Sequence, residues 1–172
     1  MQAKEYRTVD KSEWGHGPWQ DEPDKAQWQD EATGLPCLIV RNHGGALCGY
    51  VGVPDTHPWH GKGYSNCVTG CGADWCEHSP DSQTNVHGGL TFASACAKKG
   101  DESENICHIP DPGEPDNVWW FGFDCAHCND LAPGYESRNR DRGWPMLDGK
   151  YRDIDYVKAE IRGLAQQLVS VQ

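Results

Sequence analysis

Short apolar runs bounded by turn residues dominate the middle of the chain. Residues 35–41 and 46–53 are rich in apolar and β-branched side chains, and the segment 42–45 between them reads Asn-His-Gly-Gly. Runs of this length with a glycine-containing connection are typical of two antiparallel strands joined as a hairpin. We expect two further strands at 85–92 and 118–124, and the second of these is apolar enough to lie inside a sheet.

A helical period marks the C-terminal part of the chain. From Ile154 to Leu168, apolar residues recur at spacings of three and four, which places them on one stripe of a helix. Asp153 precedes the first of these residues and is a good N-cap. We therefore expect an amphipathic helix within 151–170 that packs on one face of a sheet.

The remaining segments complete a small α+β organisation. Residues 1–34 are polar and interrupted by Gly, Pro and Trp, so we interpret them as an irregular lead-in, in which Asp24 caps a short helix that ends at Gly34. Residues 35–130 are expected to form the sheet and a cysteine-rich metal loop. The predicted fold is a single domain over 1–172, with a loop-rich antiparallel sheet and a C-terminal amphipathic helix.

Composition and charge restrict the partners. The chain has 172 residues, 37% of them hydrophobic, and eight Trp, which is enough for one core in which aromatic residues carry much of the buried area. The net charge of −11 and the lack of a basic run argue against nucleic-acid polymers as partners. A pocket can still hold a nucleotide or another small ligand, because backbone amides and one or two Arg suffice for one phosphate.

Targeting signals and surface aromatics add two expectations. No apolar run has the length of a signal peptide or of a membrane span, so we expect a cytoplasmic protein with no membrane association. Exposed Trp side chains would favour a homo-oligomer.

The nine cysteines give the sharpest chemical signal. In a cytoplasmic chain, thiols are expected to be reduced or to bind metal rather than to form disulfides. Zinc prefers four soft or borderline donors in a tetrahedron, and a closed site of this kind would order the loop that carries it. One glycine-containing loop offers such a set: Cys67, Cys71, Cys76 and His78. Alternatively, the Cys-x-x-Cys pair Cys125 and Cys128 contributes to the site, and the spacing leaves both pairings open.

Polar residues also gather beside two predicted strands, where a rigid element can hold them while a loop exposes them. Glycine permits close approach of a ligand to the backbone, and histidine can donate, accept or bind metal. Histidine and carboxylate donors with an open position are also what a hydrolytic metal centre requires, and His57 and His60 are candidate additions to such a centre. Alternatively, His87 is packed before a Gly-Gly turn and Asp124 caps the chain as it leaves its strand. The expected ligand-binding surface comprises His87, Gly88, Gly89, Asp124 and His127.

Six segments carry a resemblance to known proteins: LPCLIVR at 35–41, CGYVGVP at 48–54, HPWHG at 57–61, VHGGLTF at 86–92, WWFGFDCAH at 119–127 and YRDIDYV at 151–157. Together they resemble a family of uncharacterised small proteins from bacteriophages and actinobacteria, over most of residues 14–168. The resemblance implies a phage-type accessory protein acting in the host cytoplasm and supplies no mechanism. It directs attention to the His-Gly-Gly and Asp-Cys-Ala-His segments.

Three functions from different classes follow from these patterns. The first is a zinc-binding accessory protein that binds a small ligand or a host component, such as a nucleotide signal in anti-defence. The second is a metal-dependent hydrolase that uses His87, Asp124 and His127, and the third is a virion-associated structural protein. We favour the first, because the chain has no nucleophile elbow, phosphate-binding loop or metalloprotease motif.

Overall fold

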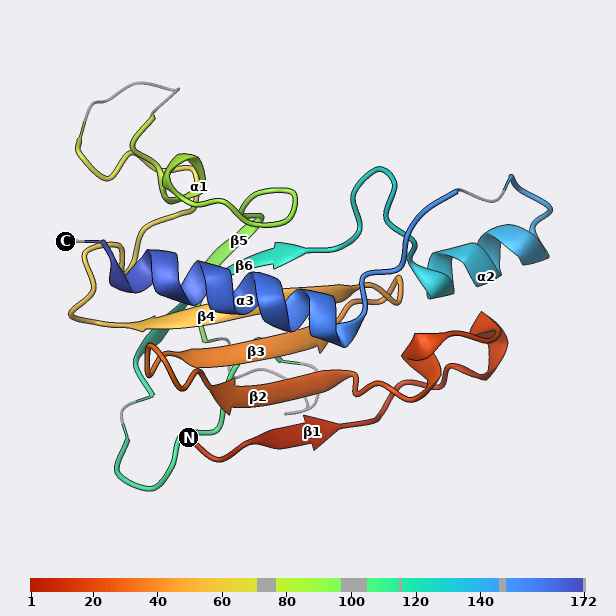
Figure 1. Cartoon of the computed structure of the whole chain (residues 1–172), viewed down its shortest axis with the longest axis horizontal. Coiled ribbons are helices and arrows are strands. Elements are labelled where there is room, and N and C mark those ends of the chain that lie inside the picture. The colour runs from red at the N-terminus through yellow and green to blue at the C-terminus, as the bar shows by residue number, and fades with distance from the viewer. Residues whose placement is uncertain (71–76, 97–104, 115, 146–147, 172) are drawn as a thin grey trace.

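The computed structural model of the chain describes residues 1–70, 77–96, 105–114, 116–145 and 148–171. One antiparallel sheet, shown in Figure 1, has the strand order β1-β2-β3-β4-β6-β5. Its strands are β1 (Lys4–Tyr6), β2 (Lys25–Gln29), β3 (Pro36–Arg41), β4 (Leu47–Pro54), β5 (Phe92–Ala95) and β6 (Val118–Asp124). The predicted α+β class with an antiparallel sheet is confirmed.

The described helices lie on one face and at the ends of this sheet. The α-helices are α1 (Pro80–Gln83), α2 (Pro133–Asp141) and α3 (Ile154–Val169), and short 3-10 turns occur at Ser12–Trp14 and Pro18–Gln20. Helix α3 runs across the sheet over β4 and β3, whereas α2 packs against the turn at Ser12–Trp14 (Figure 1). No helix of the described residues combines the length and the apolar composition needed to cross a membrane.

The predicted hairpin and the predicted C-terminal helix are both confirmed. Strands β3 and β4 pair with Ile39 opposite Gly49, and the Asn42 side chain accepts hydrogen bonds from the turn amides of Gly44 and Ala46. Helix α3 begins after Asp153, whose Oδ1 accepts a hydrogen bond from the Tyr156 amide at 2.9 Å. This side chain therefore satisfies one of the free amides of the first turn.

The main core lies between α3 and the sheet. Its helical side consists of Val157, Ile161, Leu164, Ala165 and Leu168, and its sheet side includes Cys37, Ile39, Val51, Phe121 and Phe123. Gly49 makes the close approach of the helix possible, because a Cβ there would lie 2.5 Å from the Phe123 ring and 2.9 Å from Ile161. The apolar stripe that the sequence predicts is thus the buried face of α3.

The opposite face of the sheet has its own apolar cluster, which includes Leu38, Tyr50 and Trp120. The segment around Ile109 closes one side of this cluster, since the Ile109 amide and carbonyl both bond to the Gln27 side chain. Both faces of the central strands are therefore buried, which explains why β3, β4 and β6 are apolar on both faces until Arg41 and Asp124 at the ends of β3 and β6.

Residues 25–29 correct one prediction. The short helix after Asp24 is wrong, because this segment forms strand β2, which pairs with both β1 and β3. The Asp24 carboxylate does not cap a helix; it lies 2.7 Å from Lys11 Nζ and 2.9 Å from Arg41 Nε. The Asp24 carboxylate thus stabilises the fold through buried ion pairs with residues distant in sequence, and not as a helix cap.

Residues 85–92 correct a second prediction. The strand begins only at Phe92, and the preceding residues form a turn in which Gly88 and Gly89 have φ of 68° and 84°. These values lie in the left-handed region and are incompatible with an extended strand. The apolar residues Val86 and Leu90 are nevertheless buried, since the turn packs against the main core.

The expectation of reduced thiols is wrong for part of the cysteines. Cys96 and Cys107 form a disulfide with a Cα–Cα distance of 5.0 Å, and Cys67 is also disulfide-bonded. The structure brings the segment after β5 beside the segment that covers the second face, a proximity that spacing in the sequence does not reveal. Cys37, Cys48, Cys125 and Cys128 are free.

Candidate metal centre

Two turns and the beginning of α3 bring together three potential metal donors: His87, His127 and Asp130, which we call the His/Asp cluster. His87 lies in the turn closed by the bond from the Gly89 amide to the Val86 carbonyl at 3.0 Å. His127 and Asp130 lie in the turn after β6, where the Asp130 amide donates to the His127 carbonyl at 3.0 Å.

The second turn is fixed by the segment that leads into α3. The Lys150 amide donates to the Asn129 carbonyl at 2.8 Å, and the Leu131 amide donates to the Lys150 carbonyl at 3.0 Å. Asn129 adopts a φ of 74°, which is a conformation that asparagine tolerates better than most residues. Backbone bonds on both sides therefore hold His127 and Asp130 in place.

Gly88 allows the two turns to meet. A Cβ at this position would lie 2.1 Å from Cε1 of His127, so any side chain larger than hydrogen would displace the imidazole ring. The rings of His87 and His127 are 5.4 Å apart, centroid to centroid, and cross at 64°. The structure thus brings His87, Gly88 and His127 together, and ligand binding by these residues stays a prediction.

The donor atoms of the cluster all lie within 4.8 Å of one another. His87 Nε2 is 2.7 Å from Asp130 Oδ2, and His127 Nδ1 is 3.6 Å from the same oxygen. His127 Nδ1 is shielded from solvent and makes no hydrogen bond within the described part of the chain. This unpartnered ring nitrogen can serve as a metal donor in the tautomer that places the proton on Nε2.

A second layer of side chains orients the cluster. Tyr156 Oη lies 2.9 Å from His87 Nδ1, and Arg152 Nε donates to Asp130 Oδ1 at 2.9 Å. In the metal-free chain the His87 Nε2–H can donate to Asp130 Oδ2, and a metal at Nε2 would replace this proton and leave the remaining ring proton on Nδ1, facing Tyr156 Oη. Known metal sites fix their histidine and carboxylate ligands with outer hydrogen bonds of this kind.

The electrostatic environment keeps Asp130 ionised. Burial acts to raise the pKa of Asp130, but hydrogen bonds from Arg152, His87 and the His127 amide lower it below its usual value. The same bond to Asp130 raises the pKa of Arg152. Burial and the nearby Glu160 raise the pKa of Tyr156, which keeps its hydroxyl protonated at neutral pH.

The three side chains of the cluster differ in exposure. The Asp130 side chain is 2% exposed and that of His87 is 12% exposed, whereas that of His127 is 33% exposed. The His127 ring is therefore the part of the cluster nearest to solvent, although its Nδ1 atom is itself shielded.

The remaining expected residues lie near the cluster or away from it. Asp124 Oδ1 is 3.9 Å from His127 Nδ1, and its carboxylate accepts hydrogen bonds from Thr91 Oγ1 and the Ala126 amide. His57 bonds instead to the Leu168 carbonyl at the end of α3. Neither Asp124 nor His57, nor His60, belongs to a group of three close metal donors among the described residues.

Sequence reasoning missed Asp130 as a ligand and Tyr156 and Arg152 as its supports. Asp130 follows His127 by three residues, and a turn at this spacing was the one signal that could have identified it. Arg152 lies in the segment that leads into α3, and Tyr156 lies in the first turn of this helix. Their approach to Asp130 and His87 depends on how the helix packs.

The predicted cysteine site is only partly within the described residues. Cys71 and Cys76 lie outside them, His78 is exposed, and Cys67 is disulfide-bonded, a state in which its sulfur is not a thiolate ligand. For the alternative pair, Cys125 is buried, and burial raises the pKa of its thiol, whereas Cys128 is exposed. Zinc at either cysteine set stays a prediction.

Comparison of the chain with known protein families, curated proteins and solved structures finds no match. The chemistry of the site must therefore be argued from its own residues.

Proposed function

We propose that this chain is a zinc-binding protein whose metal is held by His87 Nε2, His127 Nδ1 and Asp130 Oδ2. The observation that supports the proposal is the convergence of these three donor atoms within 4.8 Å from two separate turns. Two imidazoles and one carboxylate are a donor set that zinc accepts, and catalytic zinc sites commonly use three protein ligands.

The distances suit a small tetrahedral ion. With zinc-to-donor bonds of about 2.0–2.1 Å, neighbouring donors in a tetrahedron lie about 3.3–3.4 Å apart. The separations of 2.7 Å from His87 to Asp130 and 3.6 Å from His127 to Asp130 lie on either side of this value. The third separation, between the two histidine nitrogens, is at most 4.8 Å, so the two rings would adjust toward one another to hold one ion.

The outer hydrogen bonds support the same assignment. Tyr156 and Arg152 each bind the atom of a proposed ligand that faces away from the metal position. The ionised Asp130 supplies the negative charge that a divalent cation requires.

Zinc titration by calorimetry on chelator-treated protein tests the proposal. We expect His127→Ala to weaken zinc binding by more than the roughly 10–100-fold that loss of an outer hydrogen bond costs. His16→Ala is the matched control, because His16 is an exposed histidine outside the cluster. If His127→Ala binds zinc normally while a Cys71→Ser, Cys76→Ser double variant does not, the metal belongs to the cysteine loop.

A hydrolytic role is the second candidate, and the number of protein donors favours it. Three protein ligands leave a fourth position for a water molecule. Zinc in such a position would lower the pKa of a bound water and so supply hydroxide near neutral pH. Zinc-dependent cleavage of chromogenic acetate and phosphate esters, lost in His127→Ala, is the expected result. Turnover no faster than that of free zinc would contradict the hydrolytic role.

A further inference from the structure

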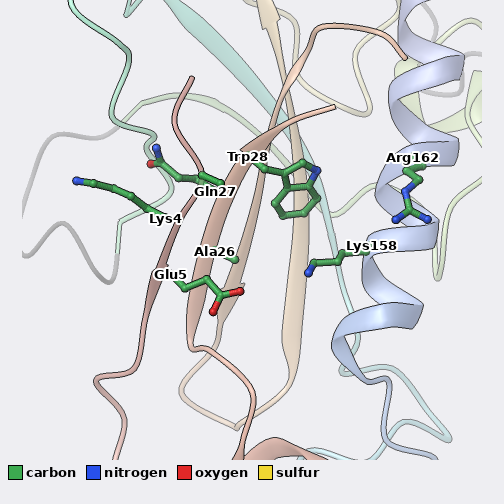
Figure 2. A pocket seen from close by; sticks show the side chains of 8 residues that line it. Lys4, Glu5, Ala26, Gln27, Trp28, Lys158 and Arg162 are labelled. Carbon is green, nitrogen blue, oxygen red and sulfur yellow. The ribbon is translucent and has the colours of Figure 1, made fainter. Parts of the chain in front are cut away.

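A groove on the other side of α3 gathers positive charge around an aromatic ring. It has a volume of about 380 Å³ and lies between β1, β2 and α3. Its lining comprises Ala3, Lys4, Glu5, Ala26, Gln27, Trp28, Lys158 and Arg162, and we call it the Trp28 groove (Figure 2). The volume is within the range of small-molecule sites.

Two cations from α3 border the groove without acidic partners. Lys158 and Arg162 are one helical turn apart, a spacing at which like charges destabilise a helix. Within the described residues, neither side chain forms an ion pair or a hydrogen bond with a carboxylate, although the whole chain carries a net charge of −11. Unpaired neighbouring cations on so acidic a protein form a local site for an anion.

Trp28 adds a ring and an indole N–H donor that face these cations from β2. Lys158 Nζ lies 5.8 Å from the centroid of the Trp28 ring. Figure 2 shows the nitrogen edge of the indole on the side of the ring that faces Arg162. The indole N–H makes no hydrogen bond with the described part of the chain, although a partly buried Trp N–H usually has an acceptor.

The other polar residues of the lining are already engaged. Glu5, the acidic member of the lining, accepts a hydrogen bond from Arg7 Nη1 at 3.1 Å, and in Figure 2 its carboxylate points toward Lys158. The Gln27 amide is bonded to Gln2 and Ile109. Lys4 points away from Lys158 and Arg162 in Figure 2. The donors that remain for a ligand are therefore those of Trp28, Lys158 and Arg162.

We propose that the Trp28 groove binds a nucleoside monophosphate. The phosphate would accept hydrogen bonds from Arg162, Lys158 and the indole N–H, because a guanidinium and an ammonium both suit phosphate oxygens. The base would lie against the Trp28 ring, since base stacking on aromatic side chains tolerates different bases.

This site is independent of the His/Asp cluster. On α3, Tyr156 and Glu160 contact His87, whereas Lys158 and Arg162 border the groove. Residues 156 and 158 are about 200° apart around a helix, so the two pairs face opposite sides. Ligand binding in the groove can therefore be measured with or without metal.

Calorimetric titration of the full chain with AMP, in the presence of chelator, tests the proposal. We expect Arg162→Gln to weaken AMP binding at least about tenfold, since it removes a charge-assisted hydrogen bond. Arg142→Gln is the matched control, because the Arg142 guanidinium lies 5.1 Å from the Trp144 ring on the exposed surface, away from the groove. His127→Ala should bind AMP normally.

Two partial ligands test the two halves of the site. Adenosine and inorganic phosphate should each bind at least about tenfold more weakly than AMP, and added salt should weaken AMP binding. Trp28→Leu should lose about tenfold as well, provided that its thermal unfolding confirms an intact fold. Absence of AMP binding, equal affinity for adenosine or phosphate, or an unchanged affinity in Arg162→Gln would each overturn the proposal.

Discussion

Two clusters of charged and polar side chains flank α3, and they differ in how completely their hydrogen bonds are satisfied. The Arg41 network, formed by Lys11, Glu22, Asp24, Arg41 and Tyr151, is buried, and the Arg41 side chain is 0% exposed. The His/Asp cluster is partly open, and His127 Nδ1 has no hydrogen-bond partner there.

The Arg41 guanidinium uses its whole donor capacity. Nε bonds to Asp24, Nη1 bonds to the Gly45 carbonyl and Tyr151, and Nη2 bonds to Glu22 and the Pro23 carbonyl. Five donors with five acceptors leave no position for a ligand. Glu22 also accepts a bond from the Ile154 amide, so the network ties the N-terminal segment to the start of α3.

The contrast separates a structural cluster from a functional one. A buried network whose hydrogen bonds are all satisfied stabilises the fold, whereas a cluster with an unpartnered ring nitrogen can bind a ligand such as a metal ion. We therefore expect mutations in the Arg41 network to change stability, and mutations in the His/Asp cluster to change binding.

The largest effect is expected for Arg41→Leu, which leaves the buried Glu22 carboxylate without its cation and leaves Asp24 with Lys11 as its ion-pair partner. Removal of one partner of a buried ion pair costs about 4 kcal/mol in the free energy of unfolding. Urea denaturation measures this cost. Arg7→Leu is the control, because the exposed pair of Arg7 with Glu5 should contribute less than about 1 kcal/mol. A loss below about 1 kcal/mol for Arg41→Leu would mean that the Arg41 network does not stabilise the fold more than an exposed ion pair does.

Asp24→Asn should lower the stability at pH 7 by about 3 kcal/mol and flatten its acid dependence. Burial acts to raise the pKa of Asp24, but bonds from Lys11 and the amides of Val9 and Thr8 lower it below its usual value. The folded pKa is therefore below the unfolded one, so this stabilisation is present above about pH 4 and is lost as the pH falls further. Denaturation midpoints from pH 7 to pH 3, with exposed Asp148→Asn as control, check both effects.

Loss of the Cys96–Cys107 disulfide should have the next largest effect. The bridge closes a loop between residues separated by 11 positions, and its removal should cost about 2.5 kcal/mol. Thermal unfolding of a Cys96→Ser, Cys107→Ser double variant measures this cost. Cys128→Ser removes an exposed free thiol and should leave stability unchanged. Equal stability of the two variants would mean that the bridge does not stabilise the fold.

Tyr156→Phe should act on binding rather than on stability. The change removes the hydroxyl group that holds His87 Nδ1, and we expect zinc affinity to fall about tenfold or more. Tyr135→Phe is the matched control, because the Tyr135 hydroxyl also bonds to a histidine, His43, but outside the cluster. Calorimetric titration of both variants compares them, and equal zinc affinities would exclude Tyr156 as a support of the site.

The smallest stability effect is expected for metal-free His127→Ala. Because His127 Nδ1 makes no hydrogen bond, its removal should change the free energy of unfolding by less than about 1 kcal/mol. Added zinc should raise the melting temperature of the wild-type chain and not that of this variant. A large loss of stability without zinc would show that His127 is a packing residue.

The parts of the fold that were predicted correctly depend on local patterns. The hairpin of β3 and β4 and the helix α3 follow from continuous apolar runs, a glycine turn and an N-cap at Asp153, all within a few residues. Strand β2 was assigned as a helix because Asp24 resembles a cap, whereas its true partner Arg41 is distant in sequence. Helix α2 was missed because its sequence has no apolar stripe.

The candidate site was predictable only in part for the same reason. His87, Gly88 and His127 were identified from polar residues near strand ends, and the structure places them together. Tyr156 and Arg152 support the arrangement through contacts across the fold, which neither spacing nor residue type reveals, and Asp130 had only its spacing of three residues from His127 as a signal.

The most direct test of the zinc assignment is anomalous diffraction at the zinc absorption edge from crystals grown with zinc. We predict an anomalous peak within about 2.0–2.2 Å of His87 Nε2, His127 Nδ1 and Asp130 Oδ2. A map with no peak among these atoms, or with zinc only at the loop that carries Cys67 and His78, would contradict the account.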